Sequence, residues 1–155
     1  MRLFSLALFV VAVVLTGCES VSSRVQDRFT GVAPQARFFA ADSKAVYDAG
    51  IKAVKALEMN VGRTSRSNGT IEAYASIRSG DATRDARQTS IQITIIPADG
   101  GETRVELLVK ETTEGDFPGG VSQQDLRIHS LYELYFGALE RQLLEAGALT
   151  APVKS

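Results

Sequence analysis

Apolar residues recur along the chain from about residue 36 with one of two periods, and each period predicts a different kind of element. Period-two alternation is typical of half-buried strands and runs through residues 70–77, 91–95 and 105–109. The last two runs flank a Pro- and Gly-containing turn at residues 97–101, so they predict a β-hairpin. Residues 36–40 and 59–65 predict two further short strands.

Apolar residues at three- and four-residue spacing predict two amphipathic helices. The first covers about residues 43–58, and Asp42 or Ser43 is expected to cap it. Its apolar stripe is rich in alanine and contains Gly50, so we expect this helix to approach the sheet closely.

The second predicted helix is long and runs from about residue 123 to residue 146. Ser122 and Asp125 resemble a capping box at its start, and Gly147 is placed to end it. Its apolar face is expected to contain Ile128, Leu131, Tyr132, Tyr135, Phe136, Leu139 and Leu143.

The element order β-α-β-β-β-β-α predicts an α+β domain over residues 36–147, followed by a C-terminal tail at residues 148–155. We expect two layers, an antiparallel sheet of four to five strands with both helices on one face. This order resembles the helix-grip arrangement of TATA-binding-protein-like domains, which small envelope lipoproteins also contain. The resemblance is one of element order and implies nothing about function.

The first residues have the parts of a secretory signal. Arg2 precedes an apolar run from Leu3 to Leu15, and small residues follow at Thr16 and Gly17. The run is too short to span a bilayer as a helix, which takes about 20 residues. We therefore expect residues 1–17 to be a cleaved signal peptide.

Leu15-Thr16-Gly17-Cys18 resembles the lipobox of bacterial lipoproteins. That resemblance implies a diacylglyceryl group on the sulfur of Cys18, cleavage by signal peptidase II between Gly17 and Cys18, and acylation of the freed amine by a fatty acid such as palmitate. Two or more acyl chains anchor a protein stably. Residues 18–35 then form a lipidated tether. In enterobacterial lipoproteins, Asp directly after the lipidated Cys tends to retain the protein in the inner membrane. Residue 19 is Glu, so the resemblance implies the outer membrane, with the domain facing the periplasm.

Composition narrows the function classes. The 155-residue chain has 17 basic and 18 acidic residues. Removing the leader takes away one basic residue, Arg2, and no acidic one, so the mature chain has 16 basic against 18 acidic residues, a poor footprint for nucleic acid. Cys18 is the single cysteine and there is one histidine, so disulfides and multi-thiolate or multi-histidine metal sites are not expected. We predict no cofactor, no metal site and no nucleic-acid partner.

Four groups of residues are functional candidates, and the structural interpretation is favoured for each. His129 has no recognisable nucleophile near it in the sequence, and aromatic residues at helical spacing (Tyr132, Tyr135 and Phe136) are more typical of a core than of a ligand groove. A mixed-charge loop is expected to be solvated, and an acidic loop lacks the spacing of a calcium site. The two loops contain Arg78, Asp81, Arg84, Asp85 and Arg87, and Glu111, Glu114 and Asp116, respectively.

Tyr74, Ile96 and Leu108 fall on the sheet face opposite the helices and form a candidate interaction surface. We therefore hypothesise a non-catalytic envelope lipoprotein whose domain binds a protein or supports an envelope assembly. One alternative is a carrier or sensor of a small apolar or lipid ligand in a groove under the C-terminal helix. A second alternative, an enzyme acting on envelope polymers, lacks a catalytic constellation in the sequence. A closed helix–sheet interface would count against the carrier.

Overall fold

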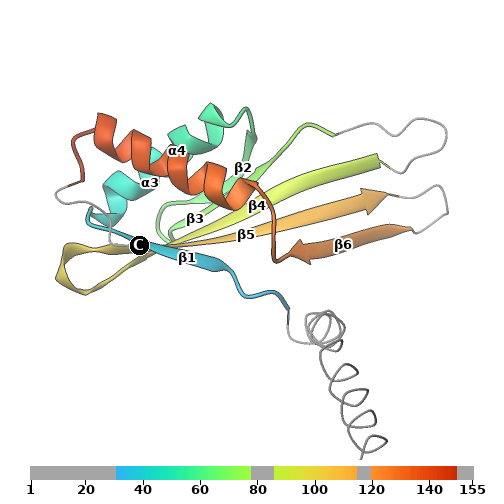
Figure 1. Ribbon diagram of the computed structural model, residues 1–155, viewed down its shortest axis with the longest axis horizontal. Coiled ribbons are helices and arrows are strands. Elements are labelled where there is room, and N and C mark those ends of the chain that lie inside the picture. Colours follow the sequence, from blue (N-terminus) through green and yellow to red (C-terminus); the bar gives the residue numbers. More distant parts are fainter. Residues whose placement is uncertain (1–30, 78–85, 115–119, 150–155) are drawn as a thin grey trace, which may run out of the picture. The chain divides into compact units, whose positions relative to one another are not determined.

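The computed structural model describes residues 31–77, 86–114 and 120–149, and these form two helices packed on one antiparallel sheet (Figure 1). The fold is the predicted α+β class. In chain order the elements are β1 (Gln35–Phe39), α3 (Ser43–Ala56), β2 (Asn60–Ser65), β3 (Thr70–Tyr74), β4 (Ala86–Pro97), a 3-10 turn at Asp99–Gly101, β5 (Thr103–Glu114), β6 (Val121–Leu126) and α4 (Leu131–Glu145).

The sheet has six strands, and β5 pairs with three of the others, β1, β4 and β6. On one side β5 continues into the series β4, β3 and β2. On its other side, β1 pairs with its first half and β6 with its second half. The predicted hairpin of β4 and β5 is confirmed, and it is longer than the apolar alternation indicated because its pairing continues to Ala86 and Glu114.

Both helices cover the same face of the sheet (Figure 1), as predicted. The alternating residues Ile91, Ile93 and Ile95 face Val109, Leu107 and Val105 across the hairpin, and all six are at most 4% exposed. They form one core with the buried sides of α3 and α4. Burial of this apolar surface is the main source of stability, at about 25 cal/mol per Å².

Helix α3 begins where the sequence predicts. The Asp42 carboxylate accepts hydrogen bonds from the backbone N–H groups of Lys44 and Ala45, which satisfies donors that lack a partner within the helix. Gly50 lets α3 pass close to α4, because a Cβ at that position would lie 3.1 Å from the Tyr135 hydroxyl oxygen. The expected close approach is therefore a contact with the other helix as well as with the sheet.

The predicted start of the long helix is wrong. Residues 121–126 form β6, and α4 begins at Leu131. Ser122 and Asp125 are strand residues opposite Thr113 and Lys110, so they do not form a capping box. The strand is favoured because the outer half of β5 would otherwise leave its backbone N–H and C=O groups without protein partners.

The predicted end of the helix is confirmed. Gly147 has a φ of 63°, a conformation that glycine adopts without strain. The N–H of Gly147 donates to the Leu144 carbonyl at 3.0 Å, and the N–H of Ala148 donates to the Leu143 carbonyl at 2.9 Å, which together form a Schellman motif. Ala148 and Leu149, which the sequence assigned to a tail, pack against the core.

Candidate functional site

The sheet face opposite the helices is uncovered in the described structure, and we call it the open face. Register places on it the side chains that alternate with the core residues. Most are polar, as expected for the solvated side of an antiparallel sheet. On β3, β4 and β5 they are Thr70, Glu72, Tyr74, Ser90, Gln92, Thr94, Ile96, Arg104, Glu106, Leu108 and Lys110.

The three residues predicted as an interaction surface all lie on the open face. Tyr74 is 41% exposed and Ile96 is 39% exposed, whereas Leu108 is half-buried. They occupy different cross-strand rows, since Tyr74 is opposite Ser90, Leu108 is opposite Gln92 and Ile96 is opposite Arg104. Polar side chains therefore separate them, and they do not form one apolar patch.

Phe38 is a fourth large apolar residue of the open face, and the sequence reasoning did not identify it. It lies opposite Arg104, which in turn lies opposite Ile96, and it is 49% exposed. The adjacent pair Phe38-Phe39 contained the signal, because one of two consecutive strand residues must point away from the core.

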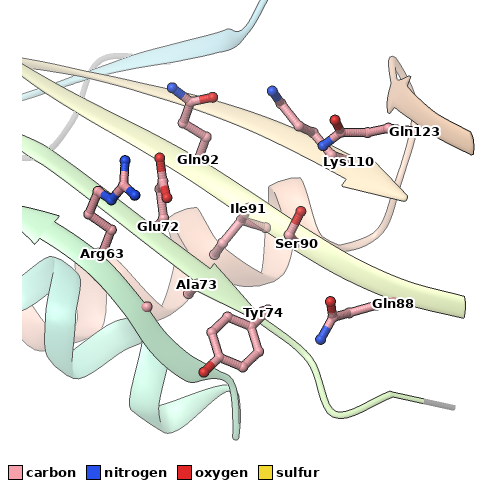
Figure 2. A pocket seen from close by; sticks show the side chains of 11 residues that line it. Arg63, Glu72, Ala73, Tyr74, Gln88, Ser90, Ile91, Gln92, Lys110 and Gln123 are labelled. Atoms are coloured by element: carbon pink, nitrogen blue, oxygen red, sulfur yellow. The ribbon is translucent and has the colours of Figure 1, made fainter. Parts of the chain in front are cut away.

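A hollow of about 440 Å³ opens on this face beside Tyr74 (Figure 2). Side chains from five strands surround it, so residues far apart in the sequence meet there. Its polar lining includes Arg63, Glu72, Tyr74, Gln92, Lys110 and Gln123. Figure 2 shows the side chains of Arg63, Glu72 and Gln92 on the same side of the sheet, with Lys110 and Gln123 beside them.

An irregularity in the edge strand β2 shapes the hollow. The register of β2 against β3 shifts between Val61 and Thr64, which inserts an extra residue as a β-bulge. A Cβ on Gly62 would lie 3.2 Å from Cε1 of Tyr74 and 3.2 Å from the Glu72 carbonyl oxygen. The ring of Tyr74 therefore rests against the backbone of Gly62, an arrangement in which an aromatic side chain covers a glycine of a neighbouring strand.

Two pairs of opposite charges lie on the open face. Nζ of Lys110 lies 4.0 Å from Oδ1 of Asp125, and the guanidinium of Arg104 lies 2.6 Å from the carboxylate of Glu106. Pairs of this exposure contribute at most about 1 kcal/mol to stability. Their consequence is that these four described residues of the open face place charges of opposite sign next to each other.

The groove proposed beneath the C-terminal helix is filled by side chains. Tyr135, Phe136, Leu139 and Leu143 are each at most 1% exposed, and the rings of Tyr135 and Phe136 meet edge to face with centroids 5.9 Å apart. This closed interface counts against the carrier of an apolar ligand. Ile128, predicted on the same apolar face, is 89% exposed.

The two buried tyrosines of α4 differ in their hydrogen bonding. The Tyr132 hydroxyl donates to the Leu126 carbonyl at 2.6 Å and accepts from the Val109 N–H at 3.2 Å, so it joins α4 to β5 and β6. The Tyr135 hydroxyl is buried without a hydrogen-bond partner among the described residues. Burial raises the pKa of the Tyr135 phenol well above its usual value.

The remaining sequence candidates have structural roles or lie outside the described residues. Nδ1 of His129 accepts the Leu131 N–H at 3.1 Å, which serves the first turn of α4. Nη1 of Arg87 lies 3.7 Å from Oε1 of Glu111. Within the described ranges, no three or more His, Cys, Asp or Glu side chains form a group able to hold a metal ion. Outside those ranges lie Gly17, Cys18, Arg78, Asp81, Arg84, Asp85 and Asp116.

A second hollow, of about 370 Å³, lies beside the start of α3. Arg66 lines this hollow. Its guanidinium forms an ion pair with the carboxylate of Asp48 and lies 4.9 Å from the ring centroid of Tyr47. The cation is therefore already partnered within the protein, which makes this hollow a weaker candidate than the one beside Tyr74.

Comparisons with known proteins give the chain no family. No protein-family model and no curated protein sequence matches it. Among solved structures it is similar to a DUF4468 family protein from Bacteroides ovatus, with 15% identity over 81% of this chain and 95% of the other, and a TM-score of 0.35. A likeness at that level carries no argument about function. In the described part of the chain, no helix has both the length and the apolar character needed to cross a bilayer.

Proposed function

We propose that this chain is a bacterial envelope lipoprotein, anchored through lipid on Cys18, whose α+β domain is a non-catalytic binding module. Its partner is a component of the cell envelope, and the domain supports envelope assembly or maintenance. The observation that carries the proposal is the hollow beside Tyr74 on the open face. Helices α3 and α4 cover the other face (Figure 1), so among the described elements no helix covers the open face, and a partner can approach it.

The chemistry of the hollow supports binding rather than catalysis. Ser90 and Lys110 are opposite each other on β4 and β5, which raises the question of a serine nucleophile with a lysine base. Nζ of Lys110, however, lies 4.0 Å from Oδ1 of Asp125, so its near neighbour is a carboxylate and not the Ser90 hydroxyl. Within the described residues, no hydrogen bond joins Ser90 to Lys110.

Lipid labelling tests the anchor. Cells that express the wild-type chain and a Cys18→Ala variant are fed a clickable fatty acid, with Ser20→Ala as a control next to the lipobox. We expect label on the wild type and on Ser20→Ala, and none on Cys18→Ala, which should accumulate as the uncleaved precursor. Lipidation of Cys18→Ala would refute the anchor.

Membrane fractionation tests the location. Wild type is expected in the outer-membrane fraction, and Glu19→Asp is expected to move toward the inner-membrane fraction. Identical inner-membrane distribution of both chains would contradict the proposed outer-membrane location.

Photo-cross-linking in intact cells tests the open face. A photoreactive phenylalanine analogue replaces Tyr74 in one variant and Leu134 in another. Leu134 is a matched control because it is 53% exposed on α4, on the helix side of the domain. We expect adducts from position 74 and not from position 134. The open face is not the binding surface if neither position yields an adduct, or if only position 134 does.

A further inference from the structure

Tyr74 offers one side of its ring to the hollow. The ring is held against Gly62, where the 3.2 Å distance to a Cβ position leaves no space between them, and 41% of the residue remains exposed. Because the ring is fixed before any ligand arrives, little side-chain freedom is lost on binding. A fixed and partly exposed aromatic ring is suited to a flat ligand with an apolar side.

Amide side chains provide the polar contacts. Gln92 and Gln123 line the hollow from β4 and β6 (Figure 2), and neither side chain has a hydrogen-bond partner among the described residues. A carboxamide both donates and accepts hydrogen bonds. A hydroxyl group does the same, so these amides are matched to a ligand that carries several hydroxyl groups.

The charges around the hollow cancel. Arg63 and Glu72 line one side, and Lys110 lies beside Asp125 on the other. An anionic polymer would meet the two carboxylates, and a cationic one would meet the guanidinium and the ammonium. An uncharged ligand meets neither penalty.

From these three features together we infer that the hollow beside Tyr74 binds an uncharged carbohydrate, a chain of pyranose rings. A pyranose has C–H bonds on its faces, whose slight positive polarisation is attracted to the negative face of an aromatic ring, and hydroxyl groups around its rim. The volume of about 440 Å³ lies within the range of small-ligand sites, about 300–1,000 Å³. This inference rests on the proposed function, since it names the partner class of the same face.

Titration calorimetry with two uncharged hexasaccharides, hexa-N-acetylchitohexaose and cellohexaose, tests the inference. The lipoprotein is purified in a detergent that has no sugar headgroup, so that the detergent does not compete. For a shallow site we expect a Kd of roughly 0.1–1 mM for at least one of them. Tyr74→Ala should weaken binding by about tenfold, or ~1.4 kcal/mol, whereas Tyr74→Phe should stay within about twofold because the ring remains.

Phe38→Ala is the matched control, because Phe38 is also an exposed aromatic residue of the open face but does not line the hollow. It should bind like the wild type. A second variant, Gln92→Ala, should lose about threefold to tenfold through its amide contacts. Unchanged thermal unfolding of Tyr74→Phe and Gln92→Ala keeps the test valid if Tyr74→Ala is less stable.

Two results would overturn the inference. One is the absence of binding to both hexasaccharides at roughly 10 mM, and the other is binding that Tyr74→Ala and Gln92→Ala leave intact. If one of these two results is obtained and position 74 still cross-links a protein in cells, the carbohydrate inference is wrong but the proposed binding module is supported. If no adduct forms there either, the proposed function fails as well.

Discussion

Replacing Tyr132 or Tyr135 with phenylalanine removes one buried hydroxyl oxygen from α4 in each case, and we expect opposite effects on stability. The two side chains are 2% and 0% exposed, and they lie three residues apart on one helix. The change in volume and in helix propensity is the same. Only the hydrogen bonding of the hydroxyl differs, so the two variants serve as controls for each other.

Tyr132→Phe should destabilise the domain. Its hydroxyl satisfies the Val109 N–H at 3.2 Å and the Leu126 carbonyl at 2.6 Å, at the end of the ladder that joins β5 and β6. Removing a partner from a buried polar group costs about 1–3 kcal/mol. Because Leu126 is half-buried and its carbonyl can recover some hydration, we expect a total loss of about 2 kcal/mol.

Tyr135→Phe should stabilise the domain. Its hydroxyl is buried with no partner among the described residues, and burying a hydroxyl without a hydrogen bond costs about 1–3 kcal/mol in proteins. The variant leaves a void of roughly 10 Å³, which offsets about 0.2 kcal/mol of the gain. A net increase of about 1 kcal/mol in the free energy of unfolding is expected.

The pH dependence gives a second measure of the same group. Burial raises the pKa of Tyr135 above its ordinary value of 10.0, so above pH 10 the unfolded chain releases a proton that the folded chain keeps. The wild type therefore loses stability through this group as the pH rises, and Tyr135→Phe does not. The advantage of the variant should widen above pH 10 by up to about 1.4 kcal/mol per pH unit.

Urea unfolding followed by far-UV circular dichroism is the appropriate assay, because the chain has no tryptophan and tyrosine emission changes with the substitutions. We expect the two variants to differ by about 3 kcal/mol at neutral pH. A loss of more than about 1 kcal/mol in Tyr135→Phe would show that its hydroxyl has a hydrogen-bond partner. Absence of a loss in Tyr132→Phe would refute the bridging role of Tyr132.

Two further stability predictions follow from close contacts in the sheet region. Gly69→Ala should destabilise by at least about 3 kcal/mol, because Gly69 has a φ of 63° and a Cβ there would lie 2.2 Å from the Ile95 carbonyl oxygen. Gly100→Ala, with a φ of 75° and open space around its Cβ, should cost only about 1 kcal/mol, and equal losses in thermal melts would contradict the clash. Thr103→Val should cost about 1–2 kcal/mol, since the buried hydroxyl donates to the Ala41 carbonyl at 2.7 Å; stability equal to that of the wild type in urea unfolding would contradict this contribution.

The elements that the sequence predicts well are those whose side chains alternate between core and solvent. Ile91, Ile93 and Ile95 in β4, with their partners in β5, show the period-two pattern because one face of each strand is buried. The helix α3 is equally readable, from its cap at Asp42 to its apolar stripe. In these segments the local pattern and the tertiary environment favour the same structure.

Strand β6 could not be predicted because its environment lies elsewhere in the chain. Its first four residues, Val121 to Gln124, are exposed, so no buried face gives them a period. Ser122 and Asp125 have the spacing of a helix cap, and that local signal favours the wrong element. The strand conformation of these residues is instead determined by the outer edge of β5, whose backbone groups pair with them over six positions.

The same dependence on distant partners limits what the sequence can say about the site. The alternation of side chains along each strand suffices to place Tyr74, Ile96 and Leu108 on the open face. It does not give the register between strands, which puts polar side chains between these three residues. The hollow requires the β2 bulge, which brings Gly62 against the ring of Tyr74, and it also requires β6, which brings Gln123 to the lining. Neither feature has an apolar pattern, because each lies on a surface that stays in contact with water. A sheet face that is simply not covered by a further layer needs neither a bulge in β2 nor an added strand β6. Because both features are present and both shape the hollow, the hollow is the place on this face to look for a ligand.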